Sequence, residues 1–336
     1  MSKKGFFGEI NIQQVPKPNK VKYYVRLADE TSIPEYTVCG YEFTLDLRKD
    51  SIGTTEGNDK ALNFRRVFLP EEGHYWVSRD FSGQELRILA NLSGEKAWVN
   101  AFLHDEDIHK ATAEAVWGKE NYSSDKRAQA KTLNFGLMYG MTPVGVSRTL
   151  GITVDEAEAL TKMFFKNLPA IKQTLDSFLK EATNTGEIKS FYGRKRRMRS
   201  YITPYGNLMS RGRTIGYNFP IQSLGADITK LAILKIYNNI LLKPEYKGKV
   251  YFMNTIHDEI NTSVAYDIAP QVIYELGEMM THKLPGGAVP IITGLEIGHS
   301  MGLIWPFNQD LETLELTPIM KELTIKEKEE QKLLWV

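Results

Sequence analysis

The sequence predicts an α+β protein in which a long helical region separates two groups of short strands. Three observations favour this class. A first strand-like run, Tyr75–Val77, comes before the helical region. Two more runs, Lys249–Met253 and Asn261–Ala265, come after it and are joined by a tight turn. Between these positions, helix-capping residues and apolar side chains at helical spacing recur along most of the chain.

The composition is that of a globular protein. With 336 residues, the chain is long enough for two or three lobes around a substantial core. The formal net charge is +1, so any surface that binds nucleic acid must be local. The single cysteine, Cys39, excludes an internal disulfide framework and a cysteine-rich zinc site, which favours a reducing compartment. No apolar stretch approaches transmembrane length, so we expect a soluble, cytoplasmic protein with no membrane partner.

The first 90 residues predict two strands and the start of a helix. Val21–Leu27 alternates enough for a strand, whereas Asp50–Lys60 is rich in glycine and small polar residues and predicts a loop. Tyr75–Val77 predicts a buried strand that runs into Asp80, and Glu85–Ala90 predicts a helix start. Asp80 would therefore lie at a strand end, a place from which carboxylates are commonly presented to metal ions.

A further helix is expected to begin at Ile108. His104 and His109 flank three acidic residues just before it, a pattern that could suggest a metal site. Solvated histidines are the commoner case, so we expect these two histidines not to bind metal.

The segment Lys126–Gly140 predicts a helix with an unusual face. Ser123 and Ser124 are good N-caps, and Gly140 suits the position just after the helix. Four residues at every fourth position share one face about 18 Å long: Arg127, Lys131, Phe135 and Tyr139. The two cations suit a triphosphate, and the two rings suit stacking on a sugar and base. The alternative is an amphipathic helix that buries its apolar residues and has a solvated basic end.

The next segments predict two structural helices and a basic region. Thr153–Glu156 forms a capping box for a helix that runs to Leu168, and another helix continues to Gly186. Lys189–Arg213 then contains eight Lys or Arg and no Asp or Glu, with aromatic residues between them. This composition suits contact with a phosphate backbone, and a flexible, solvated hairpin is the alternative.

The last third of the chain predicts a hairpin between helices. Gln222–Leu242 predicts a long helix that begins just after Pro220, so that its first turn is free to face outward. Asp258 lies in the turn between the two strand-like runs. Beyond it, Gln271–Lys283 predicts a helix and Val289–Ile297 predicts a strand.

Asp80 and Asp258 are the candidate metal ligands. Two carboxylates from separate strands suit Mg²⁺, which keeps several waters and takes one or two protein carboxylates plus substrate phosphates. Two such ions, about 3.5–4 Å apart, would clamp an in-line phosphoryl displacement. Either acid alone would mean little because surface acids are common. Together with the face that begins at Arg127, they indicate a protein that handles nucleotides or phosphates.

Three motifs resemble, in order and spacing, motifs A, B and C of family A DNA polymerases. They are DFSGQELR from Asp80, R-x-x-x-K-x-x-x-F-G-x-x-Y-G from Arg127, and IHDE from Ile256. The resemblance runs from about Leu45 to Trp305 and includes two weaker markers, GRKR at 193–196 and NFPIQ at 218–222. It implies a right-hand polymerase palm with an antiparallel sheet, helical fingers, and template-directed DNA synthesis.

The same resemblance divides the chain into five parts. It implies an N-terminal extension at 1–44, a first palm part at 45–94, fingers at 95–210, a second palm part at 211–307 and a C-terminal helical tail at 308–336. The tail holds seven acids against four lysines, and either docks on the body or anchors a partner.

The resemblance also implies roles for individual residues at a catalytic centre. Asp80 and Asp258 match the family's carboxylates that hold two Mg²⁺ ions, and Glu259 matches a third acid near them. Six residues would contact the incoming dNTP: Glu85, Arg127, Lys131, Phe135, Tyr139 and His257. Among them, Glu85 would exclude the ribose 2′-hydroxyl, and Lys131 would donate a proton to the departing pyrophosphate. Primer–template DNA would be contacted by Arg48, Asn218, Gln222, Arg194 and Arg196.

Two features depart from the family pattern. Gly83 and Gln84 replace a common Gln-Ile pair, for which we expect only local repacking. Fewer than fifty residues precede the predicted palm, so neither the thumb nor the proofreading exonuclease of the family is recognisable in this chain. We expect a separate chain to supply the thumb, the exonuclease or both, as in a split, phage-type gene. A fragment and a minimal enzyme are the alternatives, and the isolated chain is expected to be poorly processive.

Two other functions fit parts of the same pattern. A single-subunit RNA polymerase-like enzyme shares the two aspartates and a lysine–aromatic helix, but Glu85 and the HDE turn argue against it. A non-catalytic DNA-binding polymerase subunit is the other, and retention of both candidate metal ligands argues against that alternative.

Overall fold

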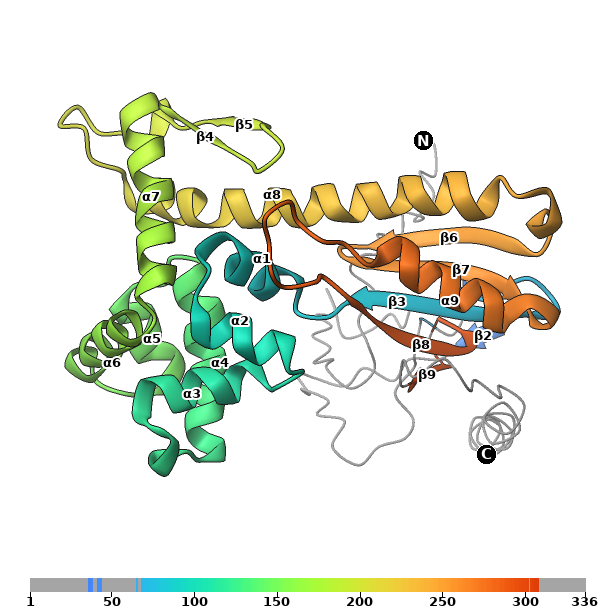
Figure 1. The fold of residues 1–336 in the computed structure, drawn as a ribbon, viewed down its shortest axis with the longest axis horizontal. Coiled ribbons are helices and arrows are strands. Elements are labelled where there is room, and N and C mark those ends of the chain that lie inside the picture. The colour runs from blue at the N-terminus through green and yellow to red at the C-terminus, as the bar shows by residue number, and fades with distance from the viewer. Residues whose placement is uncertain (1–35, 39–40, 44–64, 66–67, 302, 308–336) are drawn as a thin grey trace, which may run out of the picture.

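The structure is a computed structural model that describes residues 36–38, 41–43, 65, 68–301 and 303–307. The predicted strand Val21–Leu27, the loop Asp50–Lys60, Arg48, Cys39 and the tail 308–336 lie outside these residues. The described chain forms a sheet half and a helical half, and one long helix, α8 (Ser210–Ile236), runs along both (Figure 1). The α+β class is therefore confirmed.

The sheet half contains a five-stranded antiparallel sheet with the order β6-β7-β3-β8-β9. Its strands are β3 (His74–Phe81), β6 (Val250–Ile256), β7 (Glu259–Ala265), β8 (Thr293–Ser300) and β9 (Leu303–Phe307). The central strand β3 pairs with β7 on one side and with β8 on the other, so that the first and last thirds of the described chain form one sheet. The expected antiparallel sheet is confirmed. A separate pair, β1 (Tyr36–Val38) and β2 (Tyr41–Phe43), forms a small antiparallel hairpin.

The two faces of β3 differ because successive side chains of a strand point to opposite sides. Tyr75 and Val77 face the helices and join the main hydrophobic core, which α8 and α9 (Ala269–Met280) help to cover. Trp76 faces the other way, into a small cluster with Ile256 and Met301. On this second face the strand then becomes polar and ends in the exposed Asp80.

The helical half is built from α2 (Lys96–Leu103), α3 (Ile108–Trp117), α4 (Ser124–Met138), α5 (Pro143–Leu150), α6 (Val154–Asn167) and α7 (Pro169–Thr185). Helix α1 (Gln84–Ser93) joins it to β3. The capping residues act as the sequence predicts. Ser123 Oγ accepts from the Lys126 N–H at the start of α4, and Thr153 and Glu156 form the capping box of α6.

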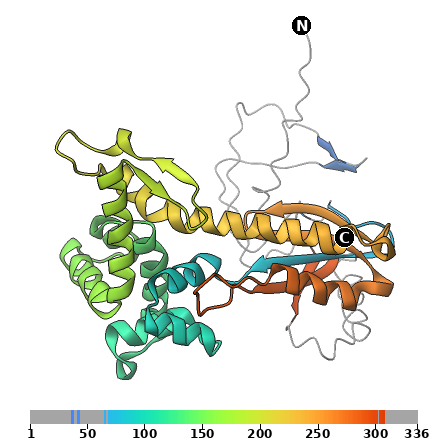
Figure 2. The ribbon, with the colours of Figure 1, turned by 45° about the horizontal axis from the view of Figure 1, so that its top comes forward.

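The basic region forms a hairpin of β4 (Glu187–Lys189) and β5 (Lys195–Arg197), which packs beside the end of α7 and the start of α8 (Figure 2). Ile188 and Met198 anchor it in a small apolar cluster with Ala182 of α7. The basic region is therefore an anchored element. Five short helices complete the described chain: η4 (Lys119–Asn121), η5 (Arg199–Tyr201), η6 (Tyr237–Leu241, a π-helix), η7 (Pro244–Tyr246) and η8 (Tyr266–Ile268).

The main error of the sequence prediction concerns α8, which begins at Ser210 and not after Pro220. Pro220 lies inside the helix, where it removes one backbone hydrogen bond at a cost of about 3 kcal/mol. Pro220 is buried, and Ile221 and Leu224 beside it are fully buried. We infer that this packing offsets the lost bond. Gln222 therefore lies in the middle of a helix and not in its first turn.

A smaller correction concerns β8, which begins at Thr293 and not at Val289. The backbone N–H and C=O of Val289 bond the side chain of Asn91, at 2.9 and 2.8 Å, and Arg87 bonds the Pro290 carbonyl at 3.0 Å. The backbone groups of Val289 and Pro290 are therefore hydrogen-bonded to side chains of α1, and the chain pairs with β3 only from Thr293 onward. Among the described helices, none has the length and apolar composition needed to cross a bilayer.

Candidate active site

Three acidic residues lie at the end of the sheet where β3 and β7 pair. Asp80 is the cross-strand partner of Glu259, so their side chains lie on the same face of the sheet. Asp258 precedes Glu259 in the turn that follows β6, and its carbonyl accepts a 3.4 Å bond from the N–H of Phe81. His257, the other residue of this turn, is exposed and has a left-handed backbone with φ 57°. The two predicted metal ligands are thus brought to the same corner of the sheet.

Exposure differs among these acids. Asp80 is exposed, Asp258 is half-buried, and Glu259 is 4% exposed. Glu259 Oε1 accepts a 2.9 Å hydrogen bond from Asn261 Nδ2, which the sequence prediction did not anticipate.

Glu85 links this corner to the helical half. It lies in the first turn of α1, which follows β3, and its Oε2 accepts a hydrogen bond from the Tyr139 hydroxyl at the end of α4. Burial raises the pKa of the Glu85 carboxyl to about 7. The charge of Asp258 adds to this increase and a hydrogen bond with Gln222 opposes it. Side chains from α1, α4, α8 and the β6–β7 turn therefore surround one carboxyl group.

The cationic–aromatic face of α4 is present as predicted. Lys131 is exposed, Phe135 and Tyr139 are half-buried, and the two rings are stacked with their centroids 6.5 Å apart. Arg127 is held in an ion pair with Asp107, which also caps the N-terminus of α3. The amphipathic alternative is also partly right, because α4 buries Leu133, Leu137 and Met138, and the half-buried Phe135 packs against the main hydrophobic core.

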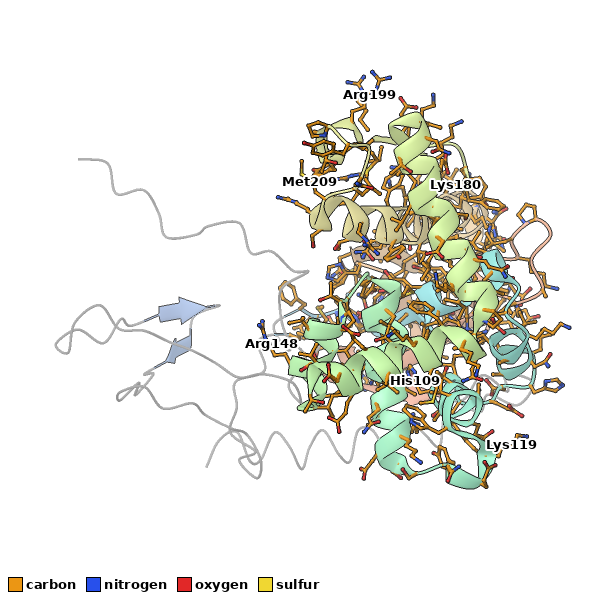
Figure 3. The ribbon with its side chains drawn as sticks, turned by 90° about the vertical axis from the view of Figure 1, so that its left-hand side faces the viewer. His109, Lys119, Arg148, Lys180, Arg199 and Met209 are labelled. Carbon is orange, nitrogen blue, oxygen red and sulfur yellow. The ribbon has the colours of Figure 1, made fainter. Side chains whose placement is uncertain are left out.

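The sequence prediction considered His109 only as a metal ligand and did not place it beside the face of α4. Its Nδ1 lies 3.0 Å from Asn134 Nδ2, and its ring centroid lies 5.8 Å from that of Phe135. Burial lowers the pKa of His109, the charges of Arg127 and Lys131 lower it further, and Asp107 opposes them. Figure 3 shows His109 in the middle of the helical half.

The predicted DNA contacts are placed on or beside α8, apart from Arg48, which lies outside the described residues. Asn218 and Gln222 are one turn apart on α8, and the Asn218 Oδ1 is buried without a hydrogen-bond partner among the described residues. Arg194 forms an ion pair with Asp227 of α8. The Arg196 guanidinium lies 6.0 Å from the centroid of the Phe219 ring. The structure therefore brings the hairpin and α8 together.

A pocket of about 420 Å³ opens beside the end of α4. It is lined by residues of the α4–α5 connection, α6 and the start of α8, among them Gly140, Phe165, Arg213 and Tyr217. Gly140 has φ 76°, and a Cβ there would lie 2.8 Å from the Tyr217 ring. A glycine therefore allows both the turn and the close approach of the ring.

The carboxylates fit Mg²⁺ better than a metal that needs a complete protein cage. Within the described ranges, no group of three or more His, Cys, Asp or Glu residues is placed to hold an ion. Mg²⁺ needs only one or two carboxylates when waters and substrate phosphates complete its shell. Asp80, near the end of β3, and Asp258, in the β6–β7 turn, provide that number.

Comparison with known proteins identifies the family. The model of "DNA polymerase family A" matches residues 44–303. A DNA polymerase I of Caldicellulosiruptor bescii is 34% identical over 233 residues, which cover 68% of this chain and 27% of the relative. A thermostable DNA polymerase I of Thermus aquaticus is 30% identical over 243 residues, which cover 72% and 28%. This chain therefore matches about a quarter of the length of these relatives.

Among solved structures, the POL domain of Pol1 from M. smegmatis, in complex with DNA primer-template and dNTP, is similar with a TM-score of 0.64. The identity is 24%, and the match covers 71% of this chain and 42% of that one. The fold is therefore similar to that of a polymerase domain. With the family match over most of its length, the chain belongs to DNA polymerase family A.

Proposed function

We propose that this chain carries out template-directed DNA synthesis, transferring a nucleotidyl group from a dNTP to a primer 3′-hydroxyl. The observation that carries this proposal is the meeting of Asp80 and Asp258 at one sheet corner, joined to the cationic–aromatic helix through Glu85 and Tyr139. Family membership and the likeness to a polymerase domain that holds primer-template DNA and dNTP support it.

The proposed palm and fingers correspond to the sheet half and the helical half of the molecule. We assign the palm to 45–94 and 211–307 and the fingers to 95–210, with an extension at 1–44 and a tail at 308–336. The boundary at 210 coincides with the start of α8, which is the helix that continues from one half into the other.

Asp80 and Asp258 would hold the two Mg²⁺ ions. The chemistry that Mg²⁺ supplies when bound is to lower the pKa of the primer hydroxyl and to neutralise charge on the pyrophosphate. Glu259 lies beside these ligands and, as a third acid, adds to the negative charge that attracts cations to the corner.

The face of α4 would bind the nucleotide. Arg127 and Lys131 would neutralise phosphate oxygens, and His109, whose ring centroid lies 5.8 Å from that of Phe135 on the same helix, would join them. Phe135 would lie against the sugar and Tyr139 near the templating base, in keeping with their stacked rings. Lys131 is exposed on this face and would give its proton to the departing pyrophosphate.

Glu85 and the residues beside α8 would set the position of the sugar and the DNA. Glu85, fixed by Tyr139, would leave no room for a ribose 2′-hydroxyl. His257 in the exposed turn would meet the primer terminus. Asn218 and Gln222 of α8, with Arg194 and Arg196 of the hairpin, would contact the primer–template.

The test is primer extension with magnesium. Asp80→Asn and Asp258→Asn each remove a charge from the metal corner and should lower extension by at least about a thousandfold, with duplex binding largely unchanged. Asp176→Asn, which removes an exposed carboxylate on α7, is the control and should extend normally. Near-normal extension by either site variant would overturn the proposal. The wild type should use dNTPs in preference to ribonucleotides, and the reverse preference would point to RNA synthesis.

A further inference from the structure

Asn261 is a fully buried amide on the face of the sheet that carries the candidate active site. It lies on β7, two residues after Glu259, so the two side chains point to the same side. Its three hydrogen bonds are to Trp76 (2.8 Å), Asn254 (2.9 Å) and Glu259 (2.9 Å). A fully apolar side chain would satisfy the packing of a buried strand position, so an amide here requires another reason.

The chemistry of its partners fixes which way the amide points. The Trp76 indole can only donate a hydrogen bond, so the Asn261 oxygen must face Trp76. The Asn261 NH₂ group is then directed to the other side, where it donates one hydrogen to Asn254 Oδ1 and one to Glu259 Oε1. Rotating the amide by 180° would place its oxygen against an acceptor-only carboxylate and its NH₂ against the indole N–H.

The position of this donor matters because acids crowd the corner. Asp80 lies directly across from Glu259, and Asp258 is its chain neighbour, so the three carboxylates repel one another when ionised. The Asn261 donor, which binds one oxygen of Glu259 at 2.9 Å, restricts the rotation of this carboxylate. Trp76, which is 1% exposed and packs with Ile256 and Met301, anchors the arrangement in a rigid cluster.

We propose that Asn261 is a positioning residue that holds Glu259 beside Asp80 and thereby tunes the binding of divalent cations at this corner. This inference rests on the function proposed above, because it assumes that the corner binds cations for nucleotidyl transfer. Residues that orient acids near a metal commonly change metal affinity or activity about 10- to 100-fold when replaced.

The test uses Asn261→Leu, which keeps the volume but removes the donor. Binding of Mn²⁺ to the protein with primer–template ending in a dideoxynucleotide is measured by electron paramagnetic resonance, so no turnover occurs. We expect Asn261→Leu to weaken Mn²⁺ affinity about tenfold. In extension assays with Mg²⁺, its maximal rate should fall by at least about tenfold, with little change in KM for dNTP.

Two further variants separate positioning from folding. Asn261→Leu leaves the Trp76 N–H without its acceptor, and adding Trp76→Phe removes this unsatisfied donor, which offsets part of the lost thermal stability but should not recover Mn²⁺ affinity. Thr262→Val is the matched control, because Thr262 is the next residue on β7, is 1% exposed, and bonds the Val77 carbonyl on the opposite face. It should bind Mn²⁺ and extend primers as the wild type does.

The outcomes distinguish the two claims. If the folded Leu variants bind Mn²⁺ and extend primers like the wild type, the positioning role is overturned and the proposed function stands. If the wild type binds Mn²⁺ but does not extend primers, the proposed function fails, and a weaker affinity in the Leu variants still supports the role of Asn261. If the wild type binds no Mn²⁺, the inference is overturned.

Discussion

Glu85 is a half-buried acid placed beside a second acid, and this position makes protein stability depend on pH. Its pKa is about 7 in the folded chain, above the ordinary value of 4.5. As pH rises from about 4.5 to about 7, the unfolded chain releases this proton while the folded chain keeps it. The folded state is therefore destabilised across this window, and the penalty is complete above about pH 7.

Glu85→Gln should remove this penalty because an amide does not titrate and can still accept from Tyr139. The free energy of unfolding of Glu85→Gln, minus that of the wild type, should be about 1–3 kcal/mol larger at pH 8 than at pH 4.5. This range includes a reduction for solvent screening of the half-exposed side chain. Thermal or urea unfolding at both pH values, with a chelator present, measures the difference. If the difference in free energy of unfolding between the two proteins is equal at pH 4.5 and pH 8, Glu85 has an ordinary pKa.

How far single residues could be predicted depends on whether their partners are local. The cations and rings of α4 follow from helix spacing, and Asp80 from its place at a strand end. The bond between Glu85 and Tyr139 joins residues 54 positions apart, and that between Trp76 and Asn261 joins residues 185 apart. Such contacts are set by tertiary packing, which no short motif records. The place of His109 beside α4 was missed for the same reason, because its partner Asn134 lies on another helix.

At the scale of elements, α3 and α4 are joined by one carboxylate with two tasks. Asp107 Oδ1 accepts from the N–H groups of His109 and Lys110 at the start of α3, while its Oδ2 pairs with Arg127 of α4. In the proposed function Arg127 binds phosphate, so Asp107 competes with the nucleotide for this guanidinium.

Asp107→Asn should keep the helix cap and lose the competing charge. Because exposed ion pairs contribute up to about 1 kcal/mol, we expect KM for dNTP to fall by up to about fivefold in primer extension. Asp107→Ala loses the cap as well and should be less stable by about 1 kcal/mol, which separates the two tasks. A rise of KM in Asp107→Asn would mean that the pair orients Arg127 for the nucleotide.

Helix α9 packs on the sheet through a buried arginine. Arg79 is 2% exposed and bonds Thr293 Oγ1 of β8 at 3.0 Å and the Ile273 carbonyl of α9 at 2.7 Å. Burial lowers its pKa to about 10, so it remains charged at neutral pH. Gly277 makes room for it, since a Cβ there would lie 2.9 Å from Arg79 Nη2.

Gly277→Ala should therefore cost about 1–3 kcal/mol of stability through overpacking. In an Arg79→Ala background the same change should stabilise the chain by about 0.5–1 kcal/mol, because alanine favours the helix and meets no obstacle. Chemical unfolding of the four proteins measures this coupling. Equal effects of Gly277→Ala in both backgrounds would show that the arginine does not need the glycine.

The elements themselves were largely predictable because their ends are marked locally. Ser123, Thr153 and Gly186 place helix boundaries from a few neighbouring residues. The failure at Pro220 has a tertiary cause, since Pro220, Ile221 and Leu224 are all buried. Sequence rules predict that a helix starts or ends near a proline. The tertiary packing that keeps α8 continuous through Pro220 cannot be recognised from neighbouring residues.

At the scale of the whole molecule, charge is concentrated although the total is near zero. The net charge is +1, yet Lys195, Arg196 and Arg197 are consecutive and exposed on β5. In Figure 3, Arg199, just beyond this strand, and Lys119 mark opposite ends of the helical half. We therefore expect the exposed cations of the hairpin to attract nucleic acid to this end of the molecule.

The hairpin cations should determine the salt dependence of DNA binding. Each phosphate contact changes the slope of log K against log salt by about 0.9, so replacing Lys195, Arg196 and Arg197 by alanine should reduce the slope by up to about 2.7. A matched variant with Lys119, Lys162 and Lys166 replaced by alanine removes the same charge elsewhere and should leave the slope unchanged. Fluorescence anisotropy with labelled primer–template, from about 50 to 200 mM salt, gives both slopes. If the slope of log K against log salt falls equally in the two variants, the net charge of the protein, and not the hairpin, determines the salt dependence. The assignment of Arg196 to DNA contact then fails.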